Sequence, residues 1–254
     1  MKEPINDLNE YVYGLHAVMA ALKMNAGNID EIWLSSHAGK NKRLSDIAGL
    51  ARASHIPVHP VTHSELDMVT DGGRHQGVVA RLKQEPAMHE TGLTGLLAGL
   101  DQDPFLLVLD GIQDPHNLGA CIRTANAAGV HAIIAPKDRA VGITPVVRKV
   151  ASGAVEATPF IQVTNLARTL RMMKDAGIWI IGLDEAGETL LFDIDLSGSI
   201  ALVLGAEGKG LRRLTREHCD FIVNIPMAGS VESLNVSVAA GICIYEAWRQ
   251  RRTS

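Results

Sequence analysis

Apolar residues along the first third of the chain alternate between helical and strand-like spacing. Helical spacing covers residues 11–22, and further helices are predicted at 44–53 and 64–69. Short apolar runs predict strands at residues 29–34, 56–61 and 77–82. Elements that alternate in this way predict a small sheet with helices packed on it.

From Phe105 onward the strand-like runs become almost purely apolar. Such runs are typical of parallel strands buried on both faces. They predict strands at 105–110, 131–135, 178–182, 200–205 and 221–225, and one within 155–163. Helices are predicted at 118–128, at 144–152, from a cap at Asn165 to Gly177, and at 234–248.

Residues 84–103 separate these two parts and contain Pro86, three glycines and at most one weak helical turn. The sequence therefore predicts an N-terminal domain at 10–83, a linker at 84–103 and a C-terminal domain at 104–254.

The last predicted helix, residues 234–248, is apolar on almost every face. A helix of this kind is buried, and a single chain of this size offers limited cover, so a homodimer is expected. Asn235 has two interpretations. It caps the helix together with Ser233, or it belongs to a polar pair held at a buried helix start, beside a loop of bare backbone N–H groups where a small ligand docks.

Composition restricts the class of protein. A chain of 254 residues with 46% hydrophobic and 20% charged residues is typical of a soluble globular protein. No apolar run is long enough to span a bilayer, and the N-terminus carries no signal core, so we expect a cytoplasmic protein. Three widely spaced cysteines indicate neither a disulfide framework nor a zinc site, and no metal is expected.

The net charge of −4 argues against binding to nucleic acid through bulk electrostatics, although it permits a local basic face. Arginine and lysine clusters occur within residues 40–43, 212–216 and 249–252. Each cluster taken alone fits a solvated surface better than a binding face.

Three loops rich in glycine or asparagine follow predicted strands, at residues 110–119, 205–210 and 226–235. Ligands bind beyond the carboxyl ends of strands in open α/β sheets, so these loops predict one composite site. The glycines of residues 205–210 fit neither the dinucleotide fingerprint nor a P-loop, and the chain has no G-x-S-x-G nucleophile elbow.

The same loops resemble the three motifs of the SpoU (TrmH-type) RNA ribose methyltransferases. The matching segments are Asp114-Pro-His-Asn-Leu-Gly-Ala-Cys-Ile-Arg-Thr-Ala, Leu204-Gly-Ala-Glu-Gly-x-Gly-Leu and Ile225-Pro-Met-x-Gly-x-Val-x-Ser-Leu-Asn-Val-Ser. The segments Tyr13-Gly-x-His-Ala-Val and His75-Gln-Gly further resemble the members that methylate a guanosine 2′-hydroxyl in the peptidyl-transferase loop of bacterial 23S rRNA.

This resemblance implies an α/β fold of the SPOUT type, with a Rossmann-like parallel sheet and a C-terminal trefoil knot. Sequence rules alone would have rejected a knot. It also implies a small N-terminal α/β RNA-binding domain of the ribosomal-protein L30e-like type, S-adenosylmethionine as methyl donor, and a homodimer acting on 23S rRNA or its precursor. A tRNA substrate or a catalytically silent RNA-binding assembly factor are the alternatives.

Carried over by motif position, the resemblance places the methyl donor against Leu204, Gly205, Ile225, Met227 and Leu234. Arg123 matches the family's essential arginine. A guanidinium stays protonated in proteins, so we expect Arg123 to stabilise a developing alkoxide or to bind a phosphate and not to act as a base. The other polar positions, which would orient Arg123, the ribose and the donor, are Asn117, Glu207, Ser233 and Asn235. Glu207 is alternatively a structural partner of Arg123.

Overall fold

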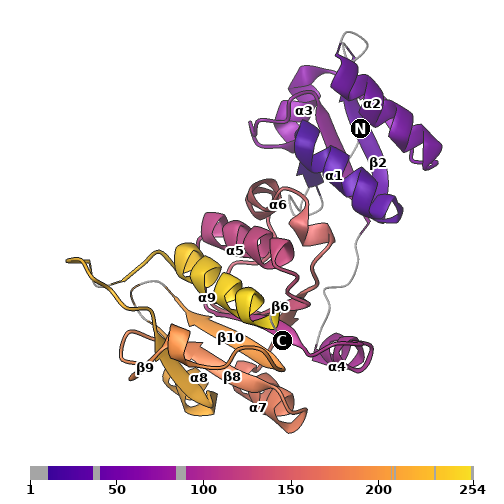
Figure 1. The fold of residues 1–254 in the computed structure, drawn as a ribbon. Coiled ribbons are helices and arrows are strands. Elements are labelled where there is room, and N and C mark those ends of the chain that lie inside the picture. Colours follow the sequence, from indigo (N-terminus) through magenta and orange to yellow (C-terminus); the bar gives the residue numbers. More distant parts are fainter. Residues whose placement is uncertain are drawn as a thin grey trace. The chain divides into compact units, whose positions relative to one another are not determined.

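The computed structural model describes residues 11–36, 41–83, 90–206, 208, 210–231 and 233–252. The chain divides into two compact units (Figure 1). One contains residues 1–86 and 143–157, and the other contains residues 87–142 and 158–254. In the described part of the chain, no helix is long and apolar enough to cross a membrane.

The N-terminal unit is built on a four-stranded sheet in the order β1-β4-β2-β3. The strands are β1 (Tyr11–Tyr13), β2 (Ile29–Ser35), β3 (Val58–Val61) and β4 (Val78–Leu82). Strand β4 runs antiparallel to both neighbours, whereas β2 and β3 are parallel. Its helices are α1 (Leu15–Asn25), η2 (Ala26–Asn28), α2 (Lys42–Ala53) and α3 (His63–Val69), with α6 (Pro145–Ala151) and η4 (Ala154–Glu156) from the later segment.

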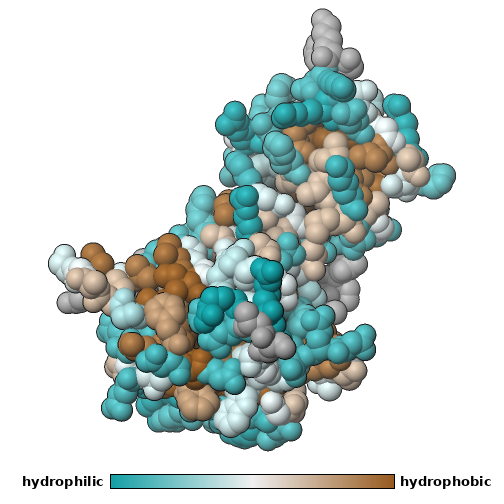
Figure 2. Space-filling view, in the orientation of Figure 1, coloured by the Kyte–Doolittle hydropathy of each residue, from teal (hydrophilic) through white to brown (hydrophobic). Residues whose placement is uncertain are grey.

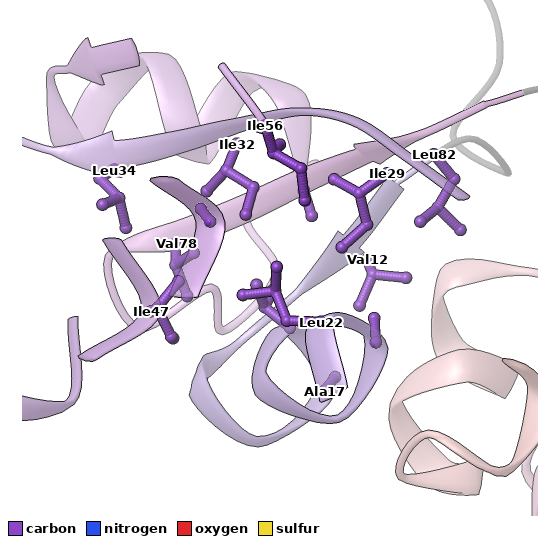
Figure 3. Packing of buried hydrophobic residues seen from close by; sticks show 14 of the residues in the cluster. Val12, Ala17, Leu22, Ile29, Ile32, Leu34, Ile47, Ile56, Val78 and Leu82 are labelled. Carbon is purple, nitrogen blue, oxygen red and sulfur yellow. The ribbon is translucent and has the colours of Figure 1, made fainter. Parts of the chain in front are cut away.

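The core of this unit lies between the sheet and the helices α1 and α2. Aliphatic side chains from these elements point toward one another (Figure 3). Ile32 from β2, Ile47 from α2 and Val78 from β4 are fully buried. Burial of each such side chain contributes about 1.5–3 kcal/mol, so the small unit has a core of its own.

The helix predicted at residues 11–22 begins too early. Residues Tyr11–Tyr13 form strand β1, and Val12 pairs with Ala80 of β4. Gly14 then adopts φ +94°, which breaks the strand before α1 begins at Leu15. The apolar spacing fitted a helix, but two tyrosines and a valine favour a strand and the edge of β4 supplies partners.

The C-terminal unit contains a parallel sheet with seven strands among the described residues, in the order β7-β6-β5-β10-β8-β11-β9. The strands are β5 (Phe105–Asp110), β6 (Ala132–Pro136), β7 (Phe160–Val163), β8 (Trp179–Leu183), β9 (Thr189–Leu190), β10 (Ile200–Gly205) and β11 (Phe221–Asn224). The predicted α/β class with a parallel sheet is therefore confirmed. The two-residue strand β9 was not predicted, because it is too short to show a period.

The helices of this unit are α4 (Glu90–Ala98), α5 (Pro115–Ala127), α7 (Leu166–Asp175), α8 (Arg213–His218) and α9 (Val236–Arg251), with the short η5 (Leu191–Asp193). Helix α5 begins three residues before its predicted start, since Asp114 caps it and Pro115 occupies its first position. Helix α4 is longer than the single weak turn predicted in the linker. Its Leu93 is fully buried among residues of β5, β6 and β7.

His131, just before β6, ties the start of β5 to the rest of the sheet. The Phe105 backbone N–H donates to His131 Nδ1 at 3.0 Å. Burial, and secondarily the charge of Arg251, lower the pKa of His131 below its ordinary value of 6.5. Protonated Nδ1 cannot accept this hydrogen bond, so the fold favours the neutral ring.

Folding stability should therefore fall as the pH drops through about 6.5, because the unfolded chain binds the proton more readily than the folded one. We expect His131→Asn, which retains an acceptor but does not titrate, to lose less melting temperature between pH 7.5 and 5.5 than the wild type. Thermal melts of both proteins across this pH range measure the difference. Parallel pH profiles would contradict this role of His131.

Candidate functional site

The three loops that follow β5, β10 and β11 come together at the carboxyl edge of the parallel sheet. Strand β10 lies between β5 and β8, and its last residue Gly205 pairs with Asp110, the last residue of β5. Two adjoining cavities open at this edge. The geometry thus matches the predicted composite site.

The first cavity has a volume of about 330 Å³. The five residues assigned to the methyl donor by resemblance all line it, as does Ser233. The other lining residues are Leu183, Asp184, Glu185, Ala206, Gly208, Gly210, Val236 and Ala239. Its walls combine aliphatic side chains with the nearly bare backbone of the loop after β10, so it is suited to a ligand with apolar and polar parts.

The second cavity has a volume of about 440 Å³ and lies beside the first, with which it shares Ala206, Gly210 and Val236. The loop after β5 supplies most of its wall. The remaining lining residues are Asp110, Gly111, Ile112, Gln113, Asp114, Asn117, Arg139 and Arg212. The side chains that line this cavity include both acidic and basic groups.

Asn235 joins two of the loops. Its side-chain oxygen accepts from the backbone N–H of Ser237 at 2.9 Å, which caps α9. Its amide nitrogen donates to Asn117 Oδ1 at 3.0 Å. Both interpretations of Asn235 therefore hold in part, since it is a helix cap and also one half of a polar pair. The residue is exposed, not buried as the second interpretation required.

Asp110 and Arg212 form an ion pair between the loops after β5 and β10. The Asp110 side chain is fully buried, and its Oδ1 lies 2.8 Å from Arg212 Nη2. Its Oδ2 accepts from the Arg212 backbone N–H at 3.2 Å. A buried carboxylate needs such compensation, so Asp110 fixes both the backbone and the side chain of Arg212.

Arg123 does not join these residues within one chain. Its side chain is exposed on α5, and it is not among the described residues that line either cavity. It lies six residues beyond Asn117, or about 9 Å along the helix axis and about 120° around it. Glu207, also assigned by resemblance, lies outside the described residues.

Several lining residues escaped the sequence analysis. Asp184 follows strand β8, and a fourth loop at the carboxyl edge was not considered. Arg139 and Arg212 lie on loops after β6 and β10 and reach the second cavity only through folding. The position of Asp184 after an apolar strand was a usable signal. Arg212 belongs to the basic cluster at residues 212–216, which the sequence analysis noted without linking it to the site, whereas Arg139 carried no signal.

The cysteines do not supply a nucleophile. Burial raises the pKa of Cys121, Cys219 and Cys243 to about 12, and for Cys219 the charge of Asp220 adds to this effect. All three therefore remain protonated thiols at neutral pH, and covalent catalysis by a thiolate does not fit them.

In the N-terminal unit, His63, Asp67 and His75 place potential metal-ligating atoms within 4.8 Å of one another. The Gly77 backbone N–H donates to His75 Nδ1 at 3.1 Å, which leaves the proton of the neutral ring on Nε2. That nitrogen lies 3.0 Å from both Asp67 Oδ1 and His63 Nδ1. The cluster therefore fits a hydrogen-bond network better than a metal site.

Two family models match the chain. The model described as "SpoU rRNA Methylase family" matches residues 104–245. The model described as "RNA 2'-O ribose methyltransferase substrate binding" matches residues 11–88. The resemblance seen in the three motifs is thus confirmed over both parts of the chain.

Relatives cover nearly the whole chain. The 23S rRNA (guanosine-2'-O-)-methyltransferase RlmB of Ralstonia nicotianae is 53% identical, with 96% of each chain covered. The Escherichia coli protein of the same name is 49% identical over 96% of this chain and 100% of that protein.

Solved structures agree in fold. The SpoU methyltransferase AviRb from Streptomyces viridochromogenes, in complex with the cofactor AdoMet, has a TM-score of 0.80 at 25% identity and covers 96% of this chain and 91% of that chain. The AdoMet-bound rRNA methyltransferase from Sinorhizobium meliloti has a TM-score of 0.77 at 26% identity, with 94% of this chain and 86% of that chain covered. By both family models and by these relatives, the chain belongs to the SpoU rRNA methylase family.

Proposed function

We propose that the protein transfers a methyl group from S-adenosylmethionine to the ribose 2′-hydroxyl of a guanosine in bacterial 23S rRNA. The observation that carries this proposal is the cavity at the carboxyl edge of the sheet, where the three motif loops meet beside a second cavity lined by acidic and basic side chains. The near full-length similarity to two 23S rRNA guanosine methyltransferases supports the choice of substrate. Such an enzyme would act in the cytoplasm, where this rRNA is made.

The first cavity fits S-adenosylmethionine in its chemistry. Leu204, Ile225 and Leu234 offer apolar surface for a purine ring, while the loop after β10 offers backbone N–H and C=O groups for polar atoms. Glycines at 205, 208 and 210 allow the ligand to approach the backbone closely. When bound, this cofactor supplies an activated methyl group on a positively charged sulfur.

The chain's own residues would then act mainly by positioning. The Asn117–Asn235 pair lies where the two cavities meet, with Asn117 on the wall of the second. Its polar groups would hold the ribose against the methyl donor, and alignment of reacting atoms accounts for much of the rate in such a transfer. Ser233, on the wall of the first cavity, would orient the donor's polar groups. Glu207 stays a candidate partner of these residues.

Arg123 would supply positive charge where the 2′-oxygen becomes an alkoxide, or would bind the adjacent phosphate. Because it is exposed on α5 and lines neither cavity, we propose that it serves a site completed by a second copy of the chain. A guanidinium stays charged at neutral pH, so its contribution is electrostatic and does not include proton abstraction.

The knot and the L30e-like character of the N-terminal domain are further parts of this proposal. The family resemblance supports the knot. In the structure the segment after β8 lies against β11, where Asp184 N–H donates to Val223 O at 3.0 Å and Asn224 Nδ2 donates to Gly187 O at 2.5 Å. A crystal structure that traces residues 184–235 without a break would test the threading. We also propose domain boundaries at residues 10–83, 84–103 and 104–254, which the family matches at residues 11–88 and 104–245 support. Residues 143–157 fall within the second match but belong to the N-terminal compact unit.

We expect a homodimer formed through α9. This helix exposes Val238 at 51% and Tyr245 at 45% of their surfaces, and the preceding loop exposes Val231 at 60%. Figure 2 shows hydrophobic surface gathered over the first half of this helix. A second copy would remove these side chains from water, which favours association.

Sedimentation or light scattering at micromolar concentration should give twice the mass of one chain. Tyr245→Glu should give the mass of a single chain and lose methyl transfer together with the dimer, whereas Trp179→Glu, at an exposed aromatic on β8, should remain dimeric. A wild-type mass equal to one chain would contradict the dimer.

Methyl transfer from labelled S-adenosylmethionine to unmodified 23S rRNA tests the proposed function. Label on the ribose of a single guanosine is the expected result. Label on tRNA alone would overturn the rRNA substrate, and RNA binding without label would favour a catalytically silent RNA-binding protein.

A further inference from the structure

The second cavity carries two arginines that none of the family motifs includes. Arg139 reaches it from the loop after β6, and Arg212 from the loop after β10. The cavity adjoins the proposed donor cavity through Ala206, Gly210 and Val236. A ribose placed at that junction brings its flanking phosphates toward these arginines. We propose that Arg139 and Arg212 form a clamp for an RNA backbone phosphate beside the target guanosine. This inference rests on the proposed function.

Arg212 is held with part of its guanidinium free to bind. Nη2 lies 2.8 Å from Asp110 Oδ1, and the backbone N–H of Arg212 donates to the same carboxylate. The side chain nevertheless remains 44% exposed, and its guanidinium contacts no other carboxylate among the described residues. A guanidinium fixed on one side by a buried carboxylate presents its remaining N–H donors in one direction, which suits a phosphate.

Arg139 occupies an unusual backbone conformation. Its φ is +60°, in the left-handed region, which residues other than glycine, asparagine and aspartate seldom adopt. Its loop is fixed to the loop after β5, because Val141 N–H donates to Ile112 O at 2.8 Å. The backbone conformation alone would favour glycine at this position. The presence of an arginine on the wall of the cavity is therefore better explained by a role of its side chain.

Gly111 lies between the two loops that carry the arginines. Its φ is +92°, and a Cβ there would lie 3.2 Å from Arg212 Nη2, so the absence of a side chain leaves room for the Arg212 guanidinium. The backbone oxygen of Arg139 lies 3.6 Å from the same position. The carboxylates of the cavity leave part of the positive charge available. Asp110 offsets the charge of Arg212 on one side of its guanidinium, whereas Arg139 has no carboxylate partner among the described residues. Asp114 Oδ1 accepts the His116 N–H at the start of α5, where the helix dipole offsets its charge.

An alternative occupant of the clamp would be the base of the guanosine. Arginine also binds the Hoogsteen edge of guanine, but a chain with net charge −4 needs local cations to hold an RNA backbone. Two guanidinium groups on separate loops surround a tetrahedral phosphate more readily than they share one base edge. The phosphate is therefore the occupant that the charges favour.

Arg139→Gly separates binding from folding, because glycine adopts φ +60° without steric cost. We expect this variant to melt no lower than the wild type and to bind the methyl donor equally well. Its KM for an rRNA fragment should rise about tenfold with kcat little changed. The slope of the logarithm of RNA affinity against the logarithm of salt concentration should become shallower by about one. Lys137→Gln, on the same loop but outside the described lining of the cavity, is the charge-matched control and should match the wild type.

Arg212→Gln alone would leave Asp110 buried and unpaired, so its loss of function would be ambiguous. The double variant Asp110→Asn/Arg212→Gln replaces the ion pair by neutral amides and should recover the melting temperature while the KM for RNA remains raised. Arg213→Gln, an exposed neighbour paired with Glu217, serves as control. Recovery of KM in the double variant would show a purely structural ion pair and overturn the role of Arg212.

RNA fragments carrying one methylphosphonate linkage next to the target guanosine identify the occupant. Loss of that charge should raise the KM of the wild type about tenfold but have little further effect on Arg139→Gly. Equal sensitivity of both proteins at every linkage would overturn the phosphate clamp. If 7-deazaguanosine, which lacks the N7 acceptor of the Hoogsteen edge, raised the KM of the wild type but not that of Arg139→Gly, the arginines would be assigned to the base. RNA binding measured without S-adenosylmethionine separates these outcomes from a failure of methyl transfer itself.

Discussion

Arg123→Ala should reduce kcat for methyl transfer by about 10²–10³, the range expected when one charged group that stabilises a developing oxyanion is removed. The side chain is exposed on α5 and lines neither described cavity, so its removal leaves no buried charge unpaired. Melting temperature and donor affinity should therefore remain close to wild type. Steady-state kinetics with labelled S-adenosylmethionine and calorimetric titration of the donor would measure the two effects. An equal loss in donor binding would contradict the assigned role.

Mixed dimers show which subunit uses Arg123. Asn235 caps α9 and bonds to Asn117 within one chain, so Asn235→Ala damages the chain's own cavities. If Arg123 serves the partner's site, mixing Arg123→Ala with Asn235→Ala by subunit exchange should restore about a quarter of wild-type activity, since half of the dimers are mixed and each has one intact site. If Arg123 serves its own chain, mixing restores nothing.

Gly205→Ala should be among the most destabilising single substitutions in the C-terminal unit. A Cβ at this position would lie 2.0 Å from Gly210 O and 2.5 Å from Leu211 N. These are backbone atoms, and they cannot retreat easily. Leu211 packs in the core, and the Gly210 N–H donates to Ala206 O at 3.0 Å. We expect a loss of about 3–5 kcal/mol in the free energy of unfolding, seen as a melting temperature lower by about 10 °C.

The same substitution should abolish donor binding, because the loop after β10 forms one wall of the first cavity. Gly198→Ala is the matched control, since a Cβ there meets nothing within 4 Å and the residue has no positive φ. It should leave stability and activity unchanged. A Gly205→Ala protein that melts and binds donor like the control would show that the loop relaxes, contrary to the tight approach seen here.

The strands of the parallel sheet were predictable because burial on both faces requires an almost unbroken run of apolar residues. Residues 105–110 and 200–205 were predicted with the bounds that the structure has. The first residues of helices and strands were less predictable where contacts between distant parts of the chain determine them. Tyr11–Tyr13 pairs with β4 although its apolar spacing fits a helix, and α4 gains its length from the burial of Leu93.

The residues of the site also differ in how far the sequence predicted them. Resemblance assigned Leu204, Gly205 and Met227 to the donor cavity, and the structure places them on one wall. Their role in binding stays a prediction. Arg139 and Arg212 could not be found in this way, because no motif contains them and they meet only when β6 and β10 are placed on either side of β5. The spacing of residues along the sequence does not indicate that these two arginines line the same cavity.

The two cavities differ in what a single mutation can alter. One wall of the first cavity is the loop after β10, where Gly205, Ala206 and Gly210 leave the backbone nearly bare. A larger side chain there collides with backbone, so this wall is hard to modify. The second cavity includes charged side chains on loops, such as Arg139 and Arg212, and loops tolerate exchange. Divergence within such a scaffold should therefore leave the cofactor constant while the RNA target drifts.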